Sequence, residues 1–140
     1  MLKVLIVDDE TVVRRGIVLG VDWASMDCVV VGEAANGEEG LAAAERYNPN
    51  LIITDVRMPR MDGIEMMRRL REKESTAHFI ILTAYDEFDY ARAALRYGAA
   101  DYLLKPFRDQ DLMSAIARVR EKEGAARPAE DTLLLPKGDK

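Results

Sequence analysis

Residues 2–10, LKVLIVDDE, decide the fold. The apolar part of this stretch is short, rich in β-branched residues and nearly free of polar alternation, which is typical of a strand covered on both faces of a parallel sheet. It runs directly into three acidic residues, where such a strand would leave the sheet. Similar runs recur along the chain, and the five strands expected are residues 3–7, 29–33, 51–54, 79–83 and 101–104.

Amphipathic segments separate these runs. Apolar residues recur at a spacing of three to four, which predicts helices over residues 10–19, 37–47, 63–72, 87–97 and 109–123. Asn36 and Asp109 suit helix starts and Gly98 suits a helix end, whereas Gly40 costs its helix about 1 kcal/mol relative to Ala. Alternating strands and helices joined by right-handed crossovers predict an α/β domain with a doubly wound parallel sheet.

The composition sets limits on the class of protein. A chain of 140 residues is one globular unit on length alone, and 49% apolar with 32% charged residues supports a core with a polar surface. The net charge of −5 argues against a surface that condenses on nucleic acid or on anionic lipid. We therefore expect no direct binding of nucleic acid by this segment.

Cysteine and histidine are scarce. Cys28 has no partner for an intramolecular disulfide, and His78 is the only histidine, so no zinc-type spacing exists. No apolar stretch reaches the roughly 20 residues of a membrane span, and the N-terminal one is too short for a signal peptide. We expect a cytoplasmic protein without membrane segments. The composition changes after Gly124, which predicts a domain over residues 1–123 and a flexible tail or truncated linker over 124–140.

Polar residues follow four of the predicted strands. Asp8 and Asp9 follow the first, Asp55 the third, Thr83 stands at the end of the fourth, and Lys105 follows the fifth. In an open α/β sheet, ligands bind outside the carboxyl ends of the strands. These side chains are therefore expected to share one rim.

Three neighbouring carboxylates cannot all stay ionised without a compensating charge. Oxygen ligands without His or Cys select a hard cation, and few carboxylates with room for water favour Mg²⁺ over a caged Ca²⁺. We expect Asp9 and Asp55 to hold Mg²⁺ directly, Asp8 to hold it through water, and the backbone carbonyl of Arg57 to add a further ligand.

The same rim is suited to phosphoryl chemistry. Asp55 stands on a different strand from the acidic pair and is the best candidate for the nucleophile, because carboxylates form aspartyl-phosphate intermediates. Lys105 would pair with a phosphoryl oxygen and Thr83 would hydrogen-bond another.

The segments VLIVDDE, ITDVRMPRMDG and ILTAYDEFDYARAALRYGAADYLLKPF resemble the receiver domain of bacterial two-component response regulators, over residues 2–123. This resemblance implies a flavodoxin-like (βα)5 fold with strand order 2-1-3-4-5. It implies that Asp55 takes phosphate from a phosphohistidine of a sensor histidine kinase. It also implies that Thr83 and Tyr102 form a switch pair and that the peptide between Lys105 and Pro106 is cis.

The resemblance also implies partners. Phosphorylation is expected to change the face built by residues 87–97 and 109–123, which would then form a homodimer or release an output domain, and the output expected beyond this segment is transcriptional. Residues 85–90, with Asp22 and Trp23, are similar to regulators with an AraC-type helix-turn-helix output. The implied protein is not an enzyme, apart from its own phosphoryl transfer and slow dephosphorylation.

Two other functions fit parts of the pattern. A Mg²⁺-dependent phosphatase of the haloacid dehalogenase type also uses an aspartyl phosphate, but it needs an aspartate where Arg57 stands. A docking module that never receives phosphate is the second alternative. Taken singly, Asp8 and Asp9 could be helix-capping acids and Tyr102 a half-buried core ring.

Overall fold

One parallel sheet forms the centre of the protein. The computed structural model describes the backbone of residues 1–134 and the side chains of residues 1–124. The strands are β1 (Leu2–Val7), β2 (Cys28–Ala34), β3 (Leu51–Asp55), β4 (His78–Thr83) and β5 (Asp101–Leu104). Their order is β2-β1-β3-β4-β5, and all neighbours are parallel. The predicted doubly wound, five-stranded fold is thereby confirmed.

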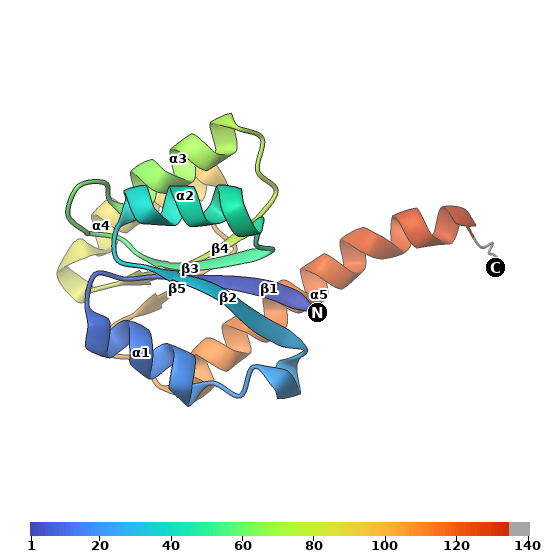
Figure 1. Cartoon of the computed structure of the whole chain (residues 1–140), viewed down its shortest axis with the longest axis horizontal. Helices are drawn as coiled ribbons and strands as arrows, with labels where there is room; N and C mark the ends of the chain where they lie inside the picture. The colour runs from blue at the N-terminus through green and yellow to red at the C-terminus, as the bar shows by residue number, and fades with distance from the viewer. Residues whose placement is uncertain (135–140) are drawn as a thin grey trace.

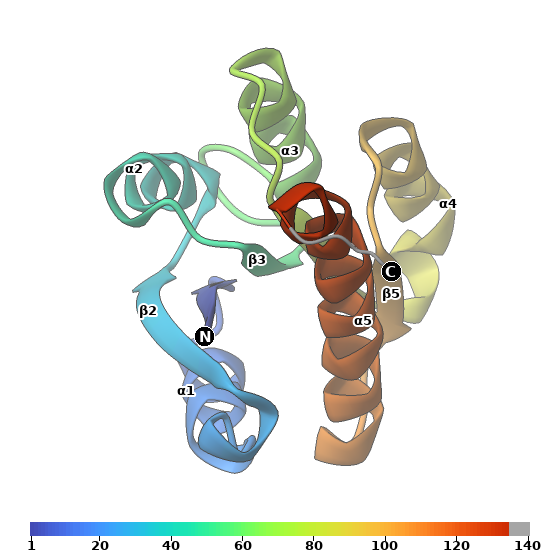
Figure 2. The same ribbon diagram turned by 90° about the vertical axis from the view of Figure 1, so that its right-hand side faces the viewer.

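Helices cover both faces of this sheet (Figure 1). One face carries α2 (Gly37–Tyr47), α3 (Gly63–Glu72) and a segment of three short helices, η2 (Tyr85–Glu87), α4 (Phe88–Ala91) and η3 (Arg92–Tyr97), which we call the α4 segment. The other face carries α1 (Thr11–Gly20) and α5 (Asp109–Leu134), with the short η1 (Ala24–Met26) before β2. Figure 2 shows the same two layers from the end of the sheet. Among the residues that the structure describes, none of the helices could serve as a membrane span.

The strands supply both halves of the core. Along β1, Leu5 and Val7 join the apolar cluster under α2, α3 and the α4 segment, while Val4 and Ile6 join the cluster under α1 and α5. All four side chains are fully buried. This two-sided burial explains why the strands read as unbroken apolar runs rather than as alternating patterns.

Side-chain contacts mark the helix boundaries. Asn36 caps α2, because its Oδ1 accepts a hydrogen bond of 2.9 Å from the Glu39 amide.

Gly40 stands where α2 meets α3, and a Cβ at this position would lie 2.5 Å from the Met66 sulfur. The glycine therefore lowers helix propensity but permits the close approach of the two helices.

Two expected elements differ from the structure. Residues 87–97 do not form one helix, because two of the three pieces of the α4 segment have 3-10 geometry. The last helix is longer than the predicted one over residues 109–123, since α5 continues to Leu134 and projects beyond the sheet (Figure 1). Extending an existing helix needs no new nucleus, so the alanines of this stretch can continue it despite Pro128. The end of the predicted tail, residues 135–140, lies outside the described residues.

Candidate functional site

Three carboxylates meet at the carboxyl edge of the sheet. Asp8 and Asp9 follow β1, and Asp55 is the last residue of β3. One carboxylate oxygen of each lies within 4.8 Å of the other two. Asp8 is fully buried, Asp55 is 5% exposed, and Asp9 faces solvent. The set provides oxygen ligands alone, which fits a hard divalent cation such as Mg²⁺.

Lys105 reaches the same cluster from the end of β5. Its Nζ lies 3.2 Å from Asp55 Oδ2, 3.3 Å from Asp8 Oδ2 and 3.4 Å from Glu10 Oε1. The Lys105–Pro106 peptide is cis, and the Lys105 amide donates to the Thr83 carbonyl at 2.8 Å. Glu10 was not singled out from the sequence, because nothing in its position predicts contact with a lysine 95 residues away.

The electrostatics of this cluster favour a bound cation. Burial, together with the charge of Asp8, raises the pKa of Asp55 to about 7, although Lys105 and the Val56 amide act in the opposite direction. Burial likewise raises the pKa of Asp8. Burial lowers the pKa of Lys105, but attraction to Asp55 and Asp8 outweighs it, so the net shift is upward. One lysine thus leaves the carboxylates short of positive charge.

Hydrogen bonds hold the two buried carboxylates in place. Asp8 Oδ1 accepts from the Glu10 amide and Asp55 Oδ1 from the Val56 amide, both at 2.8 Å. The Arg14 guanidinium donates to the Asp8 carbonyl at 2.5 Å. The remaining carboxylate oxygens, Oδ2 of Asp8 and Oδ2 of Asp55, face Lys105.

Gly63 lets α3 begin directly against this site. A Cβ on Gly63 would lie 2.2 Å from the carbonyl oxygen of Asp55, which no side chain could tolerate without a backbone shift. The Gly63 amide also donates to the Val56 carbonyl at 2.8 Å. The motif RMPRMDG contains this glycine, but only the folded chain reveals that the residue touches the backbone of Asp55.

The other predicted residues lie around the cluster rather than in it. Thr83 is fully buried at the end of β4, and its hydroxyl donates to the Ala84 carbonyl at 3.1 Å. Tyr102 on β5 is 47% exposed, and its ring centre lies 5.4 Å from that of Phe88 in an edge-on contact. The Arg57 side chain turns to the α4 segment. A guanidinium has no acceptor atom, so a role as metal ligand would fall to the backbone carbonyl of this residue.

Comparisons with known proteins agree with this geometry. The response regulator receiver domain family matches residues 4–117. The transcriptional regulatory protein BtsR of Escherichia coli is 39% identical over 136 residues, which are 97% of this chain and 54% of that protein. The transcriptional regulatory protein YesN of Bacillus subtilis is 35% identical over 119 residues, which are 85% of this chain and 32% of that protein.

A solved structure is also similar. The REC domain of AraT, a response regulator from Geobacillus stearothermophilus, shares 44% sequence identity with a TM-score of 0.86, covering 90% of this chain and 98% of that one. The chain spans from a third to about half the length of the curated relatives, and nearly the whole of this solved domain. The match in sequence, strand order and acidic rim has one explanation: this chain belongs to the response regulator receiver domain family.

Proposed function

We propose that Asp55 accepts a phosphoryl group from a phosphohistidine of a sensor histidine kinase, and that the modified domain controls an output domain. The observation that carries the proposal is the position of Asp55: a buried carboxylate within reach of Lys105 and next to two further acids, in a domain of this family. The presence of this cluster argues against a docking module that never receives phosphate.

The chain supplies the groups that the transfer needs. An oxygen of Asp55 attacks phosphorus, the phosphorus–nitrogen bond of the donor breaks, and the imidazole nitrogen keeps the electron pair. Lys105 is placed to exchange its contact with Asp55 Oδ2 for one with a phosphoryl oxygen. Asp8, Asp9, Asp55 and the Arg57 carbonyl would hold Mg²⁺, which when bound supplies positive charge at the phosphoryl oxygens. Slow loss of the phosphoryl group would be the only turnover, so the domain acts as a switch rather than as an enzyme.

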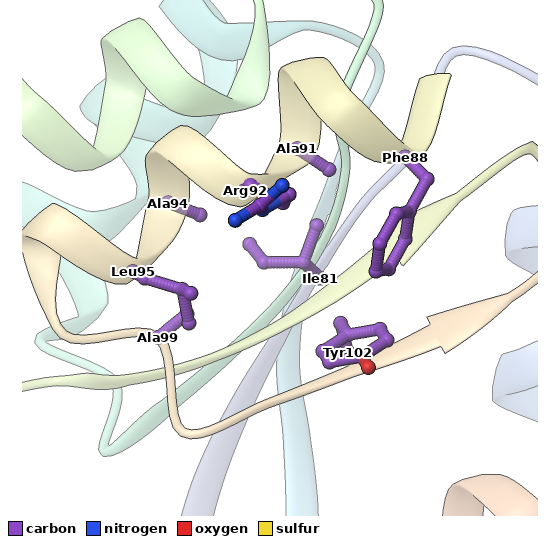
Figure 3. A pocket seen from close by; sticks show the side chains of 8 residues that line it. All are labelled: Ile81, Phe88, Ala91, Arg92, Ala94, Leu95, Ala99 and Tyr102. Carbon is purple, nitrogen blue, oxygen red and sulfur yellow. The ribbon is translucent and has the colours of Figure 1, made fainter. Parts of the chain in front are cut away.

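Thr83 and Tyr102 would carry the signal away from Asp55. In the described structure the Thr83 hydroxyl bonds the backbone, and we expect it to turn to the phosphoryl group. A cavity of about 110 Å³ lies under the α4 segment, between Ala91, Ala94 and Leu95 on the helical side and Ile81 and Tyr102 on the sheet side (Figure 3). This cavity supports an inward movement of the half-exposed Tyr102 ring.

The output domain would be a further part of a longer protein of this family. Because the curated relatives are longer transcriptional regulatory proteins, of which this chain covers 54% and 32%, we propose a DNA-binding output domain as the partner of this segment. Dimerisation through the α4 segment and α5 would then bring two output domains together. A kinase that reads signals for such a regulator would meet it in the cytoplasm.

Phosphorylation can be tested on the 140-residue chain itself. Incubation with acetyl phosphate and Mg²⁺ should add one phosphoryl group, which peptide mapping by mass spectrometry should locate on Asp55. Asp55→Asn should gain none, and removal of Mg²⁺ with a chelator should prevent the gain in the wild-type chain. Unchanged mass in the wild type, or the same gain in Asp55→Asn, would reject the proposal.

A further inference from the structure

Four side chains join the loop after β3 to the α4 segment. The Tyr90 hydroxyl donates a hydrogen bond to Asp62 Oδ2, and the Arg57 guanidinium lies 4.6 Å from the centre of the Tyr90 ring. Arg57 Nε also lies 3.5 Å from Glu87 Oε2. We call Arg57, Asp62, Glu87 and Tyr90 the latch. Two of its members, Glu87 and Tyr90, lie in the stretch of residues 85–90.

On each side of the latch, one carboxylate also accepts a hydrogen bond from a backbone amide. Asp62 caps α3, because its Oδ1 accepts from the Glu65 amide at 2.8 Å. Glu87 Oε1 accepts from the Ala84 amide at 3.4 Å, next to Thr83. The latch therefore connects Arg57 and the start of α3 to the backbone that follows Thr83.

The latch also fixes the ring that faces the proposed switch residue. Phe88 stands between Glu87 and Tyr90 in the chain, and its ring contacts that of Tyr102, which also lines the cavity (Figure 3). Movement of the Tyr102 ring into the cavity that it lines would change its contact with Phe88, the first residue of α4. A contact that holds this segment to the β3–α3 loop therefore opposes the movement.

We propose that the latch holds the α4 segment in its resting arrangement and thereby acts as a brake on the phosphorylation switch. The inference rests on the proposed function, because a brake requires a switch. In this arrangement the Thr83 hydroxyl and the Ala84 amide are both engaged within residues 83–87, so a phosphoryl group on Asp55 would have to draw Thr83 away from these contacts. Breaking the latch should lower the free-energy cost of that change. The arrangement that binds the phosphoryl group would then be more populated, and the apparent affinity rises with that population.

Tyr90→Phe is the decisive variant, because it removes the hydroxyl bonded to Asp62 and keeps the ring under Arg57. Tyr85→Phe is the matched control, since Tyr85 is 83% exposed and its hydroxyl has no hydrogen-bond partner among residues 1–124. Glu87→Gln is a second variant, which keeps an acceptor for the Ala84 amide and loses the charge facing Arg57. Thermal melting should show that all three variants fold.

Two quantities are then measured for the wild type and for each variant. The first is the rate of amide hydrogen exchange of residues 84–98 without additives, and the second is the apparent affinity for beryllofluoride with saturating Mg²⁺. Tyr90→Phe should speed exchange about fivefold and tighten beryllofluoride binding about fivefold, as expected for one partly exposed hydrogen bond to a carboxylate. Glu87→Gln should shift both quantities in the same direction, and Tyr85→Phe should leave both at the wild-type value.

The outcomes separate the brake from the proposed function. A normal wild-type response to beryllofluoride with unchanged affinity in Tyr90→Phe would overturn the brake alone, whether or not exchange became faster. Weaker binding in Tyr90→Phe would show that the latch favours the activated arrangement and would also overturn it. No beryllofluoride response in the wild-type chain would reject the proposed function, and the brake with it.

Discussion

The α3 helix and the α4 segment pack side by side on the same face of the sheet, but they are held there by different means. Their cores differ in size: α3 buries Ile64, Met66, Met67 and Leu70, whereas the α4 segment buries Ala91 and Ala94. Burial of a large apolar side chain contributes roughly 1.5–3 kcal/mol, and alanine contributes much less. The α4 segment, whose further apolar contacts come from the partly buried Ala93 and Tyr97, therefore depends more than α3 on polar contacts near its two ends.

Those polar contacts are the latch near the start of the segment and Arg71 at its end. Arg71 on α3 donates from Nε to the Tyr97 carbonyl at 2.7 Å. Hydrogen bonds at a surface can exchange partners at a small net cost, whereas an interdigitated apolar core cannot rearrange without opening cavities. The comparison explains how one face of the sheet can hold a fixed helix and a movable one next to the same site.

The largest expected effect comes from matched leucines in the two regions. Leu70 of α3 is 3% exposed and Leu95 of the α4 segment is 63% exposed. Leu70→Ala should lower the free energy of unfolding by about 2–5 kcal/mol, because it removes buried methyl groups and leaves a cavity. Leu95→Ala should change it by about 0.5 kcal/mol or less. Urea denaturation of both variants measures the difference, and equal losses would mean that the two regions are anchored alike.

A second effect of nearly this size should come from the site between the two regions. The pKa of Asp55 is raised from 3.8 to about 7. Between these two pH values, Asp55 is therefore protonated in the folded chain and ionised in the unfolded chain. The stability contributed by this proton is complete below about pH 4 and disappears as the pH rises through 7. In metal-free buffer the wild-type chain should therefore lose roughly 2–4 kcal/mol between pH 5 and pH 8.

Asp55→Asn should lack most of this pH dependence and should be more stable than the wild type at pH 8. Addition of Mg²⁺ at pH 8 should restore stability to the wild type and change the variant less. Hydrogen exchange at both pH values would show whether the repulsion loosens α3 and the α4 segment together or the α4 segment alone. A wild-type chain whose stability rises from pH 5 to pH 8 without metal would contradict the origin assigned to the Asp55 shift.

Much of the fold could be predicted from the sequence, because strands buried on both faces leave unbroken apolar runs. The predicted strand at residues 101–104 and the helices at 37–47 and 63–72 have the observed bounds. The α4 segment was predicted less well, since a three-to-four spacing of alanines does not distinguish one α-helix from shorter α and 3-10 pieces. The extension of α5 was missed because Gly124 and Pro128 are usual signs of a helix end.

The candidate site likewise has a part that could be predicted from the sequence and a part that could not. The positions of Asp8, Asp55 and Lys105 at one rim could be predicted, since parallel strands all end at one edge of the sheet. Contacts between loops could not be predicted, because no repeat or spacing in the chain relates Tyr90 to Asp62. The roles of Thr83, Tyr102 and the metal ligands stay predictions that the experiments above address.

The smallest effect tests the contact that ties the two regions together. Arg71 donates to three carbonyls, those of Tyr97, Ser75 and Ala77, while its guanidinium lies 4.8 Å from the centre of the Phe79 ring. Arg71→Lys keeps the charge but loses the planar fork, which should cost about 1–2 kcal/mol of unfolding free energy.

Because the contact holds the end of the α4 segment, Arg71→Lys should speed hydrogen exchange in residues 92–98 more than in α3. Arg96→Lys is the control, since Arg96 is exposed and has no partner among residues 1–124. An equal rise in both regions, or a larger rise in α3, would contradict this role, and the α4 segment would then depend on its buried alanines more than on the arginine. A selective rise would instead show that the movable helix is fastened at this end by a single side chain of its fixed neighbour.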